Sequence, residues 1–202
     1  MSSDAPVFPV FLKLGGRNVV VVGGGNMATS KLPALLHSGA IVTVVSPDVS
    51  KEISASPVTV VRRGFEPEDL DGAWYVVAAA TPEVNRRVAE AAGERRIFVN
   101  AVDDPANASA YLGGVLRRGD LTIAISTEGQ APAIAGLLRE ALDELLPREI
   151  ATWLEESQRQ KRIWREERVP MMARRPLMLA ALNRLYESRE KSAAGTGATE
   201  GA

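Results

Sequence analysis

The sequence predicts an α/β fold in which a doubly wound parallel sheet is followed by a C-terminal helical segment. Three observations predict it. A run of four valines, from Val19 to Val22, ends at three glycines. Further short apolar runs then alternate with helical patterns, which is typical of parallel strands joined by crossover helices. After about residue 150 only helical patterns remain.

The valine run reads as a strand buried on both faces, because it lacks the polar alternation of a one-sided sheet. The next residues recur at helical spacing and end near Gly39. Between strand and helix, Gly23, Gly25 and Ala28 match the pattern G-x-G-x-x-G/A. In dinucleotide-binding proteins this pattern serves the tight turn, the approach of the pyrophosphate and the packing of helix on strand. The alternative is a glycine-rich crossover with a purely structural role. The candidate cofactor-binding residues of this turn are Gly23, Gly24, Gly25, Asn26 and Met27.

An acidic residue for the ribose hydroxyls is expected about 20 residues later, at the end of the second strand. The second strand covers residues 41–45, and Ser46, Pro47 and Asp48 follow it. Pro47 and Asp48 are therefore further candidates for cofactor binding. Because no carboxylate stands at the strand end itself, the choice between NAD and NADP stays open.

Three more strands are expected over residues 58–61, 74–79 and 97–99, with a helix that Pro82 opens. A Rossmann-like sheet of this kind binds its ligand beyond the carboxyl ends of its strands. The polar residues at those ends are Thr81, Asn100, Asp103 and Asp104. Thr81 is a candidate for cofactor binding, and Asp103 is the best candidate for acid/base chemistry. The alternative for Asp103 is an ordinary turn before Pro105.

A different pattern begins near Gly119. A strand over residues 120–126 leads to a helix that Pro132 opens, with a wide apolar stripe that must pack against the sheet or against a second subunit. Two helices are expected over residues 151–168 and 176–186. Residues 192–202 are small and unpatterned, which predicts a disordered tail.

The composition excludes several classes of site. The 202 residues include no cysteine and one histidine, so disulfides, thiolate metal sites and multi-histidine sites are excluded. No apolar run is long enough to span a membrane, and we expect a cytoplasmic protein without a membrane partner. The formal net charge is -1, although residues 158–191 hold ten Lys and Arg against four Glu. This basic segment lacks a nucleic-acid-binding motif, so we expect no nucleic-acid partner.

Three segments together resemble a known family. VVVGGGNMATSKLPALLHSGAIVTVVSP, NAVDDP and RRGDLTIAISTEGQAPAIAGLLREALDELLP are similar to the precorrin-2 dehydrogenases, including the dehydrogenase/ferrochelatase module of siroheme synthases. The similarity spans about residues 7 to 147. It implies NAD as cofactor, oxidation of the tetrapyrrole precorrin-2 to sirohydrochlorin, and Asp103 as the catalytic aspartate.

The resemblance also implies a homodimer built through a dimerisation region. The expected division is an NAD-binding domain over residues 1–112, the dimerisation region over 113–149, a helical domain over 150–191 and the tail. The candidate substrate-binding residues, on the expected tetrapyrrole side, are Asn100, Ser126 and Thr127. Iron insertion into sirohydrochlorin is left open, and no metal-binding residue is assigned. The alternative from another functional class is a regulatory module that senses NAD(H) without turnover.

Overall fold

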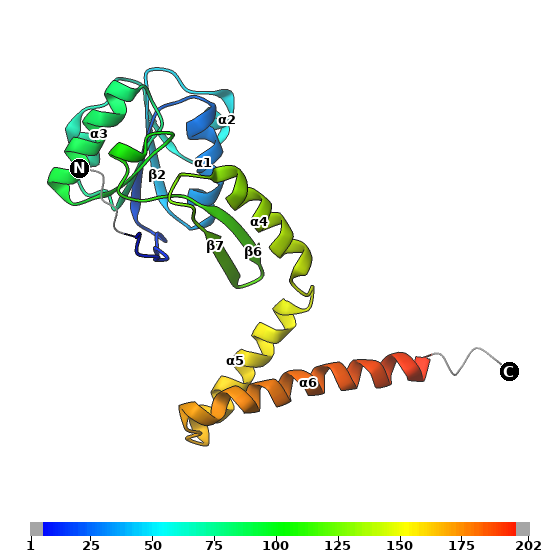
Figure 1. Ribbon diagram of the computed structural model, residues 1–202. Helices are drawn as coiled ribbons and strands as arrows, with labels where there is room; N and C mark the ends of the chain where they lie inside the picture. The colour runs from blue at the N-terminus through cyan, green and yellow to red at the C-terminus, as the bar shows by residue number, and fades with distance from the viewer. Residues whose placement is uncertain (1–5, 197–202) are drawn as a thin grey trace. The chain divides into compact units, whose positions relative to one another are not determined.

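The computed structural model describes the backbone of residues 6–196 and the side chains up to residue 184. It divides the chain into two compact units. The first comprises Met1–Gly113 and Ser126–Pro132, and the second comprises Gly114–Ile125 and Ala133–Ala202. Figure 1 shows the helices and strands of each unit.

The first unit is built on a five-stranded parallel sheet with the strand order β3-β2-β1-β4-β5. The strands are β1 (Asn18–Val22), β2 (Ile41–Val45), β3 (Thr59–Val61), β4 (Tyr75–Ala78) and β5 (Phe98–Ala101). The connecting helices are α1 (Asn26–His37), α2 (Lys51–Ala55) and α3 (Pro82–Arg95), with short 3-10 turns η1 (Pro67–Leu70) and η2 (Pro105–Asn107). The predicted doubly wound parallel sheet is confirmed.

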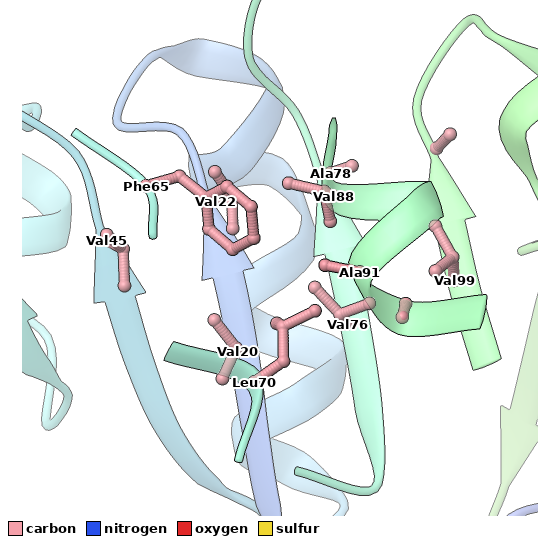
Figure 2. Close-up of a cluster of buried hydrophobic side chains, with 12 residues drawn as sticks. Val20, Val22, Val45, Phe65, Leu70, Val76, Ala78, Val88, Ala91 and Val99 are labelled. Carbon is pink, nitrogen blue, oxygen red and sulfur yellow. The ribbon is translucent and has the colours of Figure 1, made fainter. Parts of the chain in front are cut away.

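Alternate residues of β1 point to opposite faces of the sheet, as the two-residue period of a strand requires. Val20 and Val22 belong to a core cluster with α3 and η1, while Val19 and Val21 belong to a second cluster with α1 and α2. Figure 2 shows the first cluster, where Val88 of α3 lies beside Ala78 of β4 and Ala91 of α3 lies beside Val76 of β4. The valine run is therefore buried on both faces because helices cover both.

The second unit begins with an antiparallel hairpin of β6 (Gly114–Arg118) and β7 (Leu121–Ile125). Strand β7 was predicted from the sequence, whereas β6 was not. Gly119 has a φ of 57° in the turn between them. The backbone of β6 lies close to α4 (Pro132–Leu145). A Cβ atom built at Gly114 would be only 2.9 Å from the carbonyl oxygen of Ala135, so glycine permits this approach.

Arg118 ties the hairpin to the end of α4. Its guanidinium donates hydrogen bonds to the carbonyl oxygens of Leu146 and Asp143, at 2.5 and 2.8 Å, and pairs with the Asp143 carboxylate. The last carbonyl groups of a helix receive no hydrogen bond from within the helix and carry the negative end of its dipole. A cationic donor at this end is therefore favourable.

Two helices complete the unit: α5 (Ile150–Glu166) and α6 (Met171–Thr196). They contact each other, and each has one buried apolar residue, Trp164 in α5 and Ala181 in α6. Residues 192–196, expected to belong to a disordered tail, instead continue α6. Ala193 and Ala194 are strong helix formers, whereas Gly195 and Thr196, at which the helix ends, are weak ones. Residues 197–202 of that tail lie outside the described residues. Within residues 6–196, no helix combines the length and the apolar character that a bilayer crossing needs.

Candidate functional site

A pocket of about 510 Å³ opens within the first unit, where β4 and β5 end. Such a position agrees with the general rule that open parallel sheets bind ligands beyond the carboxyl ends of their strands. The lining residues come from the start of α1, from the segments after β4 and β5, and from the first turn and a half of α3. They are Met27, Ala79, Ala80, Pro82, Asn85, Arg86, Val102, Asp103, Asp104 and Asn107.

The three glycines before α1 have three different surroundings. Gly23 has a φ of 122°, and a Cβ atom there would be 2.2 Å from the carbonyl oxygen of Ala79. A Cβ atom at Gly24 would be 1.8 Å from the carbonyl oxygen of Asp48. A Cβ atom at Gly25 would meet nothing within 4 Å. Gly23 and Gly24 therefore permit close packing of backbone on backbone, while the space beside Gly25 is open to a ligand.

Among the described residues, no side chain caps the start of the helix that follows this turn. Gly25 is the N-cap of α1, and the first turn holds no acidic residue. The backbone N–H groups of a first helical turn lack intrahelical acceptors and carry the positive end of the helix dipole. Ala28 is fully buried, so α1 packs tightly against the sheet. An open glycine and an uncapped helix fit the pyrophosphate of a dinucleotide.

The turn after β2 is fastened to the glycine turn. The Ser50 N–H donates to the carbonyl oxygen of Gly24 at 2.8 Å, and the Ser46 hydroxyl donates to the carbonyl oxygen of Asp48 at 2.7 Å. The side chains of Pro47 and Asp48 are exposed. The structure thus brings these two predicted residues next to the glycine turn. The sequence analysis gave no role to Ser46 and Ser50, whose hydrogen bonds shape this turn.

Asp103 lies on the pocket wall directly after β5. Its backbone is left-handed, with a φ of 55°, which aspartate tolerates better than most residues. Its side chain is exposed, whereas the neighbouring Asp104 carboxylate accepts a hydrogen bond from Asn107 Nδ2 at 2.7 Å. Both residues line the pocket, but they differ because the Asp104 carboxylate is held by Asn107, whereas the Asp103 side chain is exposed.

The start of α3 supplies a residue that the sequence analysis missed. Asn85 is 3% exposed and lines the pocket, and its Oδ1 accepts a hydrogen bond from the Ala80 N–H at 3.0 Å. The available signal was one polar residue on the same helical face as Val88 and Ala92. Thr81, which was predicted to contact the cofactor, lies outside the pocket lining. The pKa of Glu83 is lowered by a hydrogen bond from its own backbone N–H and, to a smaller extent, by one from the Thr81 hydroxyl.

The three predicted substrate-binding residues have hydrogen bonds inside the protein. The buried Asn100 donates from Nδ2 to the carbonyl oxygen of Ala110 at 3.1 Å. Ser126 Oγ accepts from the Glu128 N–H, and Thr127 Oγ1 accepts from the Ala131 N–H. None of the three is among the residues that line the pocket. Of the predicted site residues, the pocket brings together Met27 and Asp103.

Among the residues that the structure describes, no group of three or more His, Asp or Glu side chains is arranged to hold a metal ion.

Comparison with known proteins identifies two family segments. A family described as putative NAD(P)-binding matches residues 10–114, and one described as sirohaem biosynthesis protein central matches residues 118–145. The two matches fall within the region, residues 7 to 147, over which the resemblance was noted.

Siroheme synthases are among the curated relatives. Siroheme synthase 3 of Aeromonas hydrophila subsp. hydrophila is 40% identical over 147 residues, which are 70% of this chain and 31% of that protein. Siroheme synthase 1 of Aeromonas salmonicida is 42% identical over 147 residues, with the same two shares. The chain thus spans about a third of the length of these relatives.

A solved structure, described as SirC, precorrin-2 dehydrogenase, resembles this chain with a TM-score of 0.67 and 27% identity. The similarity covers 86% of this chain and 88% of that one. The expected resemblance and the nicotinamide dinucleotide cofactor are confirmed. With its glycine turn, its parallel sheet and a family match over more than half of its length, this chain belongs to the putative NAD(P)-binding family.

Proposed function

We propose that this chain is an NAD-dependent dehydrogenase that oxidises precorrin-2 to sirohydrochlorin in siroheme biosynthesis. The observation that carries the proposal is one pocket whose wall combines the start of the uncapped α1 with the exposed carboxylate of Asp103. The similarity to SirC supports the substrate, because it extends over most of both chains.

Each part of the site has a separate task. The backbone N–H groups at the start of α1, together with the open space beside Gly25, hold the pyrophosphate. Bound at this site, NAD⁺ would supply the hydride acceptor for the oxidation. The same oxidation releases one proton, and Asp103 takes it as general base. The pocket walls orient the two reactants, which supplies much of the rate enhancement.

The reaction is tested by mixing purified protein, NAD⁺ and precorrin-2 and following the absorbance of sirohydrochlorin and NADH. Asp103→Asn is the appropriate variant because asparagine also tolerates the left-handed backbone at this position. Loss of a general base lowers kcat about 10²-fold or more. The general-base role is wrong if this variant turns over at the wild-type rate.

The same assay distinguishes an enzyme from a regulatory NAD(H) sensor. A sensor would bind NAD⁺ in a calorimeter and give no sirohydrochlorin. Iron insertion is a separate reaction, and it is tested by adding Fe²⁺ to sirohydrochlorin and following siroheme absorbance with wild type and Asp103→Asn.

We also propose that the chain forms a homodimer through α4. This helix exposes a stripe of apolar side chains: Ile134 at 51%, Leu137 at 62%, Leu138 at 47% and Leu145 at 77%. A second copy of the stripe is the self-complementary surface that a two-fold dimer requires. Light scattering should give a dimer mass for wild type and a monomer mass for Leu137→Asp. A monomeric wild-type protein at micromolar concentration would end this proposal.

A cytoplasmic location is part of the same proposal, since NAD⁺ is available there. Fractionation of the producing cells tests it.

A further inference from the structure

Asn85 is a polar residue in an apolar position. It lies on the buried side of α3, one turn before Val88, and only 3% of it is exposed. Burying an amide is costly unless its donor and acceptor groups find partners. One half of this side chain has its partner, because Oδ1 accepts from the Ala80 N–H at 3.0 Å.

This hydrogen bond fixes which way the amide points. A backbone N–H requires an acceptor, so the oxygen must face Ala80 and the Nδ2 donors must face the other way. Among the described residues, side chains and backbone alike, the hydrogen bonding of the Asn85 side chain is limited to this one bond through Oδ1. The one side-chain polar atom that is fully enclosed without a partner in that part of the chain is the Tyr75 hydroxyl. Asn85 Nδ2 is therefore not sealed in, and the pocket that Asn85 lines is the space onto which it opens.

The topology indicates which half of a dinucleotide occupies this pocket. The strand order places β2 on one side of β1 and β4 on the other. The adenosine ribose of a bound dinucleotide lies toward the end of β2. The pocket is lined from the ends of β4 and β5, so it receives the nicotinamide half.

We propose that Asn85 Nδ2 donates a hydrogen bond to an acceptor oxygen in the nicotinamide half of the dinucleotide. That oxygen is either the carboxamide oxygen of the ring or a hydroxyl of the adjoining ribose. The inference rests on the proposed dinucleotide-dependent function and adds a cofactor-binding residue beyond the glycine turn. By holding the nicotinamide side, Asn85 favours the complete dinucleotide over its adenosine fragments.

The test is calorimetric binding of NAD⁺, NADH, ADP-ribose and ADP to wild type and two variants, at pH 8. Asn85→Asp retains an oxygen for the Ala80 N–H and loses the donor. Asn85→Ala removes both groups without adding a charge. We expect both variants to bind NAD⁺ and NADH about 10-fold more weakly, the loss that one hydrogen bond predicts, and to bind ADP within about twofold of wild type.

The two fragments identify the acceptor. Weaker binding of ADP-ribose as well as NAD⁺ assigns the hydrogen bond to the ribose, and unchanged ADP-ribose binding assigns it to the carboxamide. Either result supports the inference. An unchanged ratio of NAD⁺ to ADP affinity in both variants overturns it.

Two controls complete the experiment. Asn183→Asp places the same charge on an exposed position of α6, and it should leave all four affinities unchanged. Thermal melts show which variants are folded, and Asn85→Ala decides the outcome if the buried charge of Asn85→Asp prevents folding. Wild-type protein that binds no NAD⁺ would overturn the proposed function itself, whereas normal binding by both wild type and variants would overturn the role of Asn85 alone.

Discussion

Two neighbouring glycines should respond to the same substitution in opposite ways. A methyl group at Gly24 would lie 1.8 Å from the carbonyl oxygen and 2.9 Å from the carbonyl carbon of Asp48. Real side chains do not approach backbone so closely, so the turn after β2 must move away. That movement also strains the hydrogen bonds that Ser50 and Ser46 make there.

The size of each effect follows from these contacts. Overpacking costs about 1–3 kcal/mol, and each weakened hydrogen bond adds about 1 kcal/mol. We therefore expect Gly24→Ala to lower the free energy of unfolding by about 3 kcal/mol. Gly25→Ala meets nothing within 4 Å, and its backbone φ of −87° suits alanine. Its stability should stay within about 0.5 kcal/mol of wild type, because a small capping loss opposes the reduced entropy of the unfolded chain.

For NAD⁺ binding we expect the specific loss at Gly25, the position where the substitution leaves stability unchanged. In the proposed binding mode, the methyl group of Gly25→Ala occupies the space of the pyrophosphate, so its Kd for NAD⁺ should rise about 10-fold or more although the protein is as stable as wild type. Urea denaturation measures stability, and calorimetry measures Kd on the folded proteins. Wild-type NAD⁺ affinity in Gly25→Ala, or wild-type stability in Gly24→Ala, would refute the roles assigned to these glycines.

Three further substitutions test other parts of the chain. Tyr75→Phe removes a buried hydroxyl without a partner among the described residues, so stability should be unchanged or rise by about 1 kcal/mol. Burial raises the pKa of Tyr75, so the free energy of unfolding of wild type should fall as the pH rises above about 10, where the tyrosine of the unfolded chain ionises. Urea denaturation at a series of pH values should show a smaller fall for Tyr75→Phe. The hydrogen bond from Arg63 lowers the pKa of Asp69, so its stabilisation is present above about pH 4 and disappears as the pH falls. Asp69→Asn should therefore cost at most about 1 kcal/mol at pH 7 and flatten the acid limb of the same titration. Arg175→Ala should raise the KM for precorrin-2, the proposed carboxylate-rich substrate, at low salt, and the difference should shrink as salt is added. An unchanged KM at low salt would show that the basic helices do not attract this substrate.

The parallel sheet could be predicted because its signals are local. Four valines in a row are incompatible with a strand that has one wet face, and the glycines that follow stop the strand where the turn must be tight. The short strand β6 was missed because its five residues, GVLRR, include no clear alternation and begin with glycine. Gly114 is needed because α4 approaches the backbone closely there, a contact that no local sequence pattern predicts.

The candidate site was predictable only in part, for a similar reason. Asp103 could be singled out because it follows a strand, but its left-handed backbone depends on the turn that the folded chain makes. Asn85 was overlooked because its role comes from the Ala80 N–H, a partner that becomes apparent only when α3 lies on the sheet. The substrate contact of Asn100 stays a prediction, and the structure adds that its Nδ2 donates to the carbonyl oxygen of Ala110, a partner that no local pattern indicates.

The path of the backbone between the two units limits where the chain can be truncated to obtain a folded fragment. The chain leaves the first unit after Gly113, returns for Ser126–Pro132 and leaves again. In that returning loop, Gly129 lies beside the ring of Tyr111 and the side chain of Pro105, so it packs close to the turn that carries Asp103. A stop codon after residue 113 would therefore delete part of the first unit's own packing. An isolated dinucleotide-binding fragment that retains this packing must therefore include residues 126–132.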